Sequence, residues 1–339
     1  MQINTASKRV LTTADILKFL CAIMVIGIHT QPMGDRLNGG YFLTTIFRVA
    51  VPFFFVFSSY VFFSKNSSIS KYVKRLLMLE VAWTILESPF IAYTYFVASG
   101  NSFFISFLNL IKGMLFGETY LGSWFIHASW MGMVVVYWLS KSPKYLQMSL
   151  SILFFVLALL DTSYQYVVIN VGLSEVWSSL NKVIYPSESF MVAYPYMLIG
   201  KCIADSHSEQ CRRVFYWLPL SSILLLVEAL VCRHLCGSTI EYILNPRFEV
   251  FLCLPLVAYF LVKLSLSLQT PINIEVSKYL RNMSILMYLS HRLLMIFIFK
   301  AGIEAEGVIF FLMTILASSL FSWSLIKLSN KLPFLKYLF

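Results

Sequence analysis

The sequence predicts an all-α polytopic membrane protein, with about ten transmembrane helices in one bundle. Three observations predict it: of the 339 residues, 59% are hydrophobic, only 12% are charged, and the mean hydropathy is +0.77. A soluble domain carries about 25% charged residues, so this chain has too few charges to cover a soluble surface. The composition excludes a disulfide-rich secreted scaffold, a disordered regulator and a nucleic-acid-binding domain.

About ten segments are long and apolar enough to cross a bilayer as helices. A crossing helix needs about 20 predominantly apolar residues, and aromatic residues gather at many segment ends, as they do at membrane interfaces. Two longer connections, near 99–121 and 162–187, are apolar enough to lie on the membrane surface. No linker or repeat separates two folded bodies, so we predict one integral-membrane domain over residues 1–339. The predicted spans are 14–33, 43–64, 76–98, 122–140, 145–161, 188–204, 214–232, 248–268, 283–301 and 305–327.

The basic residues are distributed unevenly between the two sides of the predicted bundle. With ten spans both termini lie on one side, and that side holds 17 of the 26 Lys and Arg residues, whereas the other holds six. Membrane proteins carry their excess of basic residues in cytoplasmic loops, so we expect both termini in the cytoplasm. The net charge of +10 then reflects topology and not nucleic-acid binding.

Three ionisable residues lie in the first predicted span, where such groups are costly and mark functional sites by default. Asp15 and Lys18 are three residues apart and can pair on one helix face. Lys18 and His29 are eleven residues apart, about three helical turns, so both project from one face about 16 Å apart. Taken singly, Lys18 could snorkel to the headgroups and His29 could be an interfacial residue. A common stripe with an acid one turn away favours a site.

Further polar residues interrupt the later spans. Arg48 stands at the boundary of the second span, near the depth of His29, and Pro52 can kink the helix that follows. Two carboxylates in the third span suggest pairing with a cation or a proton path. The fourth span opens with a Trp, which is also typical of a membrane interface, and a His one turn further in, and a His-Arg pair in the ninth span needs a cavity, a partner or a ligand. These residues are Glu80, Glu87, Trp124, His127, His291 and Arg292.

The cysteines do not predict a metal centre. Cys232, His234 and Cys236 are close in sequence, but their spacing matches no standard zinc pattern and no second ligand pair follows. Cys21 and Cys253 lie in the middle of predicted spans, where a small apolar side chain packs well. We therefore expect no metal.

The order of the motifs resembles the acyltransferase 3 family of membrane O-acyltransferases. Members typically open with an Asp-x-x-Arg pair and a His eleven residues after the Arg, and Asp15, Lys18 and His29 stand in these places. The family's later motifs are a basic-aliphatic-Val-Pro-Phe-Phe run, a Ser-Gly-Tyr, a basic loop, a Trp-Phe and a Ser-x-x-x-Tyr-x-x-His. They match Arg48-Val49-Ala50-Val51-Pro52-Phe53-Phe54, Ser58-Ser59-Tyr60, Lys71 to Arg75, Trp124-Phe125, and Ser284 with Tyr288 and His291.

The resemblance implies an enzyme that moves acetyl or a related acyl group from cytoplasmic acyl-CoA to a hydroxyl of an extracytoplasmic or lipid-linked glycan. It implies a bacterial inner membrane as location, and acyl-CoA as a co-substrate instead of a resident cofactor. His29 would be the general base, with an acyl-histidine intermediate as the alternative route, and Asp15 would hold Lys18, which orients the donor. The resemblance assigns the acyl donor to Lys71, Lys74 and Arg75, and the acceptor to Arg48, Trp124 and His291.

Departures from the family pattern bear on the substrate more than on the fold. Lys18 replaces an Arg and so lacks the bidentate fork that suits phosphate. Ser59 replaces a Gly, the His usual just before Trp124 is absent, and Met78 stands where a second Arg is expected in the basic loop. Topology alone is also a sufficient reason for a basic loop at this place.

A carrier is the competing interpretation. Ten spans with buried Glu80, Glu87 and His residues also fit a proton-coupled exporter or polysaccharide translocator. Transporters are often built from two related halves with broken helices in matching positions. Pro52 and Pro255 both interrupt spans, but we find no such duplication in the sequence. A transferase leaves free CoA and an ester, whereas a carrier moves an unmodified substrate.

Overall fold

Every regular element in the described part of the chain is a helix. The computed structural model describes residues 11–34, 40–116, 124–206, 213–237, 247–268, 270–303 and 307–339. The elements are α1 (Thr12–Thr30), α2 (Gly40–Phe47), α3 (Ala50–Ser64), α4 (Ile69–Leu86), α5 (Ser88–Ala92), η1 (Tyr93–Ala98), α6 (Phe103–Phe116), α7 (Trp124–Leu139), α8 (Lys144–Asp161), α9 (Gln165–Asn170), α10 (Ser174–Asn181), η2 (Pro186–Glu188), α11 (Phe190–Asp205), α12 (Val214–Gly237), α13 (Leu254–Ser267), α14 (Ile274–Lys300), α15 (Val308–Ser329) and η3 (Pro333–Leu338).

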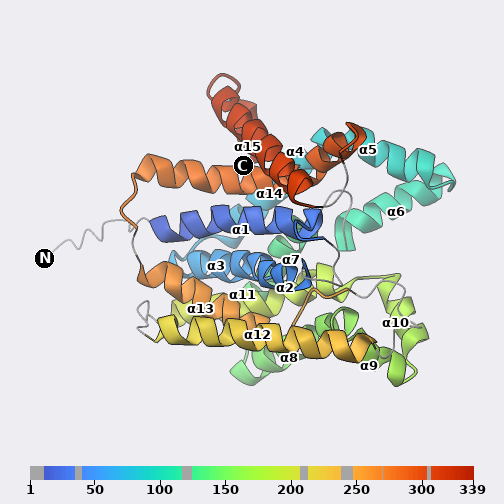
Figure 1. Cartoon of the computed structure of the whole chain (residues 1–339), viewed down its shortest axis with the longest axis vertical. Helices are drawn as coiled ribbons and strands as arrows, with labels where there is room; N and C mark the ends of the chain where they lie inside the picture. The colour runs from blue at the N-terminus through green and yellow to red at the C-terminus, as the bar shows by residue number, and fades with distance from the viewer. Residues whose placement is uncertain are drawn as a thin grey trace, which may run out of the picture.

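The long helices run side by side and give the bundle two distinct ends. In Figure 1, α1 lies between α14 and α3, and α12 and α13 lie beyond α3. We call the left end in this view, where α1 begins, the Lys18 end, and the right end, where α1 finishes, the His29 end. The short helices α5, α6, α9 and α10 all gather at the His29 end.

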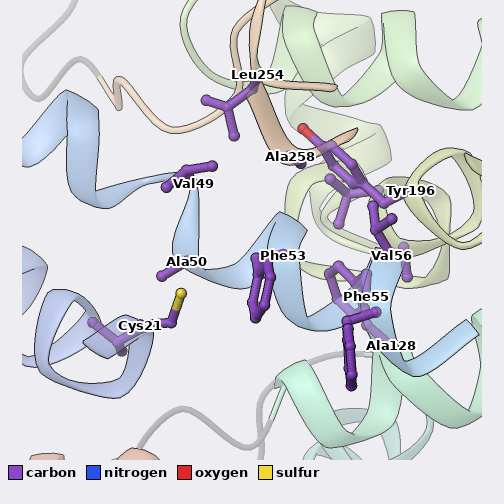
Figure 2. Packing of buried hydrophobic residues seen from close by; sticks show 14 of the residues in the cluster. Cys21, Val49, Ala50, Phe53, Phe55, Val56, Ala128, Tyr196, Leu254 and Ala258 are labelled. Carbon is purple, nitrogen blue, oxygen red and sulfur yellow. The ribbon is translucent and has the colours of Figure 1, made fainter. Parts of the chain in front are cut away.

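Helix α3 is the central element of the bundle. Its 15 residues are apolar almost all round, as expected for a helix that packs against neighbours on every side. Phe53, Phe55 and Val56 are fully buried. Figure 2 shows them surrounded by side chains from α1, α7, α11 and α13, among them Cys21, Ala128, Tyr196, Leu254 and Ala258.

Helices α3 and α11 approach each other so closely that a glycine is required between them. A methyl group at Gly200 would overlap the carbonyl oxygen of Val56 and lie 2.8 Å from Cβ of Ser59. The Ser59 hydroxyl is buried at this contact and donates a hydrogen bond of 2.6 Å to the carbonyl of Met197. Small residues that allow backbones to approach, with a hydroxyl that bonds across the contact, are typical of helix pairs in membranes.

Gly200→Ala is therefore expected to lower the free energy of unfolding by about 3 kcal/mol, the upper end of the overpacking range. The clash is with backbone atoms of α3, so relief requires the two helices to separate. The matched control is Gly132→Ala, where the new methyl would meet the side chains of Ala193 and Met197 at 2.9 and 3.1 Å. Cβ of Ala193 is fixed to its backbone, but this overlap is smaller than the one at Gly200 and the Met197 side chain can move, so the control should cost about 1 kcal/mol. Thermal unfolding of both variants in nanodiscs measures the difference, and equal melting temperatures would contradict the close approach.

The predicted count of about ten transmembrane helices is not confirmed. Each of the ten predicted segments contains a helix, but in the described residues six helices are long and apolar enough to cross a membrane, or seven if the bent pair 69–98 is one span. Three of the others, α7, α11 and α13, are only 14 to 16 residues long. A straight crossing takes about 20 residues, so these three helices are shorter than a straight crossing requires, and the count of ten stays a prediction.

Breaks within segments account for other differences from the sequence-based expectation. The third predicted span bends by 70° at Glu87, where Ser88 and Pro89 start the new helix α5. The apolar connections near 99–121 and 162–187 hold helices of their own, α6 in the first and α9 and α10 in the second. Both sets lie at the His29 end in Figure 1.

Candidate functional site

The first polar cluster lies near the start of α1. Lys18 Nζ is 3.1 Å from Asp15 Oδ1, which confirms that these two residues pair on one helix face. The other carboxylate oxygen of Asp15 accepts a 2.7 Å hydrogen bond from the Ser277 hydroxyl of α14. The Lys18 ammonium also lies over the Phe57 ring of α3, 4.3 Å from its centre. One cation is thus held by three helices, α1, α3 and α14.

The second cluster lies at the other end of α1 and also involves α14. The imidazole rings of His29 and His291 have centroids 5.2 Å apart and planes tilted by 33°. His291 is buried, and its Nδ1 lies 2.5 Å from the backbone carbonyl of Tyr288. The family resemblance predicts different roles for His29 and His291, as base and as acceptor residue; the structure brings the two rings together.

Aromatic rings extend this cluster towards α7. The Tyr288 ring lies 6.0 Å from His291 and 5.0 Å from Phe125, measured between centroids. Trp124, the first residue of α7, contacts Phe125 and the Phe55 ring of α3. Trp124 is therefore at the His29 end, and aromatic side chains lie between it and the histidine pair.

The remaining residues predicted for a site divide between the two ends. Arg48 lies between α2 and α3 and forms an ion pair of 3.5 Å with Glu249. Lys71, Lys74 and Arg75 lie in the first two turns of α4, which begins shortly after α3 finishes at the Lys18 end, and all three are exposed. The structure thus separates the basic cluster of α4 from the histidine pair by most of the length of α1.

The buried carboxylate of Asp161, which was not predicted from the sequence, joins several segments at the His29 end. The Asp161 side chain is fully buried at the last residue of α8. One of its oxygens accepts hydrogen bonds from the side chains of Trp177 and Asn181, at 3.2 and 3.0 Å. The other accepts from the Ser187 backbone and hydroxyl and from the Arg247 guanidinium, at 3.2, 2.6 and 3.1 Å. Asp161 therefore fastens α10, η2 and the segment before α13 to the end of α8.

Arg247 is the cation of this network. It donates a 2.7 Å hydrogen bond to Glu188 in addition to its bond to Asp161, and its guanidinium lies over the Tyr185 ring. Burial by itself would lower the pKa of Arg247, but the surrounding carboxylates of Glu249, Glu188 and Asp161 outweigh it and raise the pKa above the ordinary arginine value. Arg247 is thus a permanent cation in this network.

A third polar cluster lies inside the bundle between α4 and α7. Glu80 is buried and accepts a 3.2 Å hydrogen bond from the indole of Trp130. Nδ1 of the buried His127 lies 4.0 Å from the other Glu80 oxygen. The neighbours of this carboxylate of the third predicted span are thus an indole and an imidazole of the fourth.

Local patterns carried little signal for the partners that complete these clusters. Ser277 and Glu249 are ordinary polar residues in sequence. Each contacts a charged residue far away along the chain, Ser277 with Asp15 and Glu249 with Arg48. Asp161 did carry a signal, because it closes an apolar run of α8, but a charge at the end of a span is most simply interpreted as its boundary.

Comparisons with known proteins identify the family. No solved structure matches the chain. Two curated proteins of Enterococcus faecalis, both named amino-acid racemase, match at 24% identity over 94% of this chain and 23% over 65% of it. The aligned regions cover 46% and 32% of those proteins, so the chain spans less than half the length of either. A family model described as an acyltransferase domain matches residues 12–327, nearly the whole chain. This chain therefore belongs to the acyltransferase 3 family.

Proposed function

We propose that this protein moves an acyl group, acetyl in the first instance, from acyl-CoA to a hydroxyl of an extracytoplasmic or lipid-linked glycan. The observation that carries the proposal is the meeting of His29 with His291 at the opposite end of α1 from Lys18, in a chain of an acyltransferase family. A titratable base at the His29 end suits the acceptor hydroxyl, and a fixed cation at the Lys18 end suits the anionic donor. The two substrates would then approach from opposite sides.

The proposed chemistry takes place at His29. A neutral imidazole is a competent base near neutral pH, and positioned proton transfer contributes about 10²–10⁴-fold to a rate. His29 removes the proton of the acceptor hydroxyl while the oxygen attacks the thioester carbonyl. The C–O bond forms, the C–S bond breaks, and the proton passes from His29 to the departing thiolate, which leaves as free CoA.

The acyl donor is assigned to the Lys18 end. Lys71, Lys74 and Arg75 form an exposed basic cluster that suits the phosphates of CoA. Lys18, fixed by Asp15 and the Phe57 ring, orients the part of the donor that enters the bundle. Because acyl-CoA is made in the cytoplasm, this end faces the cytoplasm of a cell whose inner membrane holds the protein, with both termini on that side.

The acceptor is assigned to the His29 end. Trp124 of α7 is linked to the histidine pair through the rings of Phe125 and Tyr288, and Arg48 lies between α2 and α3. Such residues hold sugars by stacking and by hydrogen bonding. Racemisation is not part of this proposal, since the alignments cover less than half of the racemases.

Release of free CoA tests the proposal. The purified protein in nanodiscs is supplied with acetyl-CoA and a panel of glycan acceptors, and both the free thiol and the acyl ester are measured. We expect the thiol and the ester to appear in equal amounts, and only when an acceptor is present. Thiol without ester, or neither product despite bound acetyl-CoA over a broad panel, would contradict it.

Neutralising the basic cluster of α4 should weaken the binding of the acyl donor and leave the chemical step unchanged. In Lys71→Gln/Lys74→Gln/Arg75→Gln, the KM for acetyl-CoA is expected to rise about tenfold, since each exposed charge pair contributes up to about 1 kcal/mol, while kcat changes little. The effect should shrink at high salt, which screens exposed charges.

The control for this variant is Lys182→Gln/Lys300→Gln. These two exposed lysines lie at the ends of α10 and α14, at the His29 end of the bundle, and their loss should leave the KM unchanged. An equal rise of KM in both variants would mean that only the overall surface charge matters.

A proton-coupled carrier is the second candidate, and the Glu80–His127 pair favours it. A carboxylate and an imidazole 4.0 Å apart inside a bundle can exchange a proton during transport. The carrier predicts movement of an unmodified glycan or small molecule that depends on a pH gradient and on Glu80. The transferase predicts ester formation that Glu80→Gln leaves largely intact.

A further inference from the structure

The hydrogen bond of His291 to the backbone determines which of its nitrogens carries the proton. Its Nδ1 lies 2.5 Å from the carbonyl oxygen of Tyr288. A carbonyl oxygen only accepts hydrogen bonds, so Nδ1 must be the protonated nitrogen of the neutral ring. Nε2 is then a bare lone pair, and only a donor can satisfy it.

The lone pair at Nε2 is buried and lies in the immediate neighbourhood of His29. His291 is 2% exposed, and Nε2 has no hydrogen-bond partner in the part of the chain that the structure describes. Buried polar atoms are normally paired, so an unpaired acceptor in the interior calls for an explanation. The ring of His29 is 5.2 Å away between centroids, a separation at which a small rotation brings an N–H of His29 to Nε2 of His291.

We propose that His291 is a positioning residue for His29: its Nε2 accepts the N–H of His29, so that the other His29 nitrogen is the unprotonated one and can take the proton of the acceptor hydroxyl. This inference rests on the proposed function, because it gives a task to the proposed base. A general base needs a second group that fixes its tautomer and orientation, a role for which acyl-transfer enzymes often use a carboxylate. Here a neutral imidazole, itself fixed by the α14 backbone, has that role.

The proton balance of the step is unchanged by this arrangement. The hydroxyl proton moves to the bare nitrogen of His29, which becomes an imidazolium as the C–O bond forms. Its other N–H then donates more strongly to His291, which stabilises the charge while it lasts. The transferred proton leaves with the thiolate, so both rings return to their starting states.

The test compares two variants of His291 that differ in one property. His291→Phe keeps a ring of similar size and removes the acceptor, whereas His291→Gln places an amide oxygen near the position of Nε2. In the Phe variant kcat is expected to fall about 10²-fold, the lower part of the range for positioned proton transfer, with both KM values within about twofold. The kcat of the Gln variant should be about tenfold higher than that of the Phe variant. Ser290→Ala, which changes a fully buried neighbour on the same helix, should match the parent protein.

A spectroscopic readout separates this inference from the function itself. The chain has five histidines, so ¹⁵N-histidine spectra in nanodiscs can be assigned by single substitutions. We expect His291→Phe to shift the protonated nitrogen of His29, and Ser290→Ala to leave it in place. If no acyl transfer is found in any assay but this shift occurs, the proposed function fails and the pairing of the histidines stands.

Three results would overturn the inference. One is a His29 spectrum that His291→Phe leaves unchanged. The second is a rise in the acceptor KM at constant kcat, which would make His291 a direct binding residue for the acceptor. The third is a Gln variant no more active than the Phe variant, because acceptor capacity would then be irrelevant.

Discussion

Replacing His29 by Ala is expected to abolish acyl transfer, with a decrease in kcat of about 10²-fold to 10⁴-fold, the full contribution of a positioned base. The truncation removes the α1 ring that lies against His291. The other end of α1 keeps its Asp15–Lys18 pair and its bond to Ser277, so donor binding should persist. Free-thiol release and acetyl-CoA binding, measured on one preparation, check both parts of the prediction.

The matched control for this variant is His234→Ala. His234 lies in the last turn of α12, is exposed and belongs to none of the clusters described above. It should retain the parent rate. A fully active His29→Ala protein would defeat the assignment of the base, and a His29→Ala protein that fails to insert would have to be replaced by His29→Gln in the same assay.

Asp161→Asn is expected to cause the largest loss of stability, about 3–5 kcal/mol, the cost of breaking a buried ion pair on one side. Both carboxylate oxygens receive hydrogen bonds, one from Trp177 and Asn181, the other from Ser187 and Arg247. An amide nitrogen at either position would confront donors, and Arg247 would lose one of the three carboxylates that surround it. Thermal unfolding in nanodiscs, with protease sensitivity of the segments near α10, measures the effect.

Asp205→Asn provides the comparison for Asp161. Asp205 also pairs with a basic residue, Lys201, but its side chain is 56% exposed at the opposite end of the bundle. Exposed ion pairs contribute little, so this variant should change the free energy of unfolding by less than about 0.5 kcal/mol. If both variants unfold at the same temperature, the buried network does not stabilise the His29 end.

The helical class and the positions of the helices could be predicted from the sequence, because they depend on local composition. Apolar runs in the sequence predicted every long helix. The three-residue spacing of Asp15 and Lys18 correctly predicted their ion pair. The number of full crossings could not be predicted in the same way. It depends on where each helix breaks, as at Pro89, and on helices such as α13 that are apolar but short.

The composition of the site depended on contacts that no local pattern contains. His29 and His291 come from the first and the fourteenth α-helix, and Asp15 and Ser277 are 262 residues apart in sequence. The similar depth of Arg48 and His29 could be estimated from the sequence, but the ion pair of Arg48 with Glu249 could not. The depth of a residue along its helix can be estimated from its number in the sequence. Which other helix lies opposite its side chain depends on the packing of the whole bundle.

The most direct test of the central claim uses sealed proteoliposomes with acetyl-CoA outside and the glycan acceptor trapped inside. The account assigns donor and acceptor to opposite ends of α1, so it predicts an ester on the trapped glycan and an equal amount of free CoA outside, both absent with His29→Ala. Unmodified glycan that leaves the vesicles without CoA release would contradict the account and establish a carrier instead.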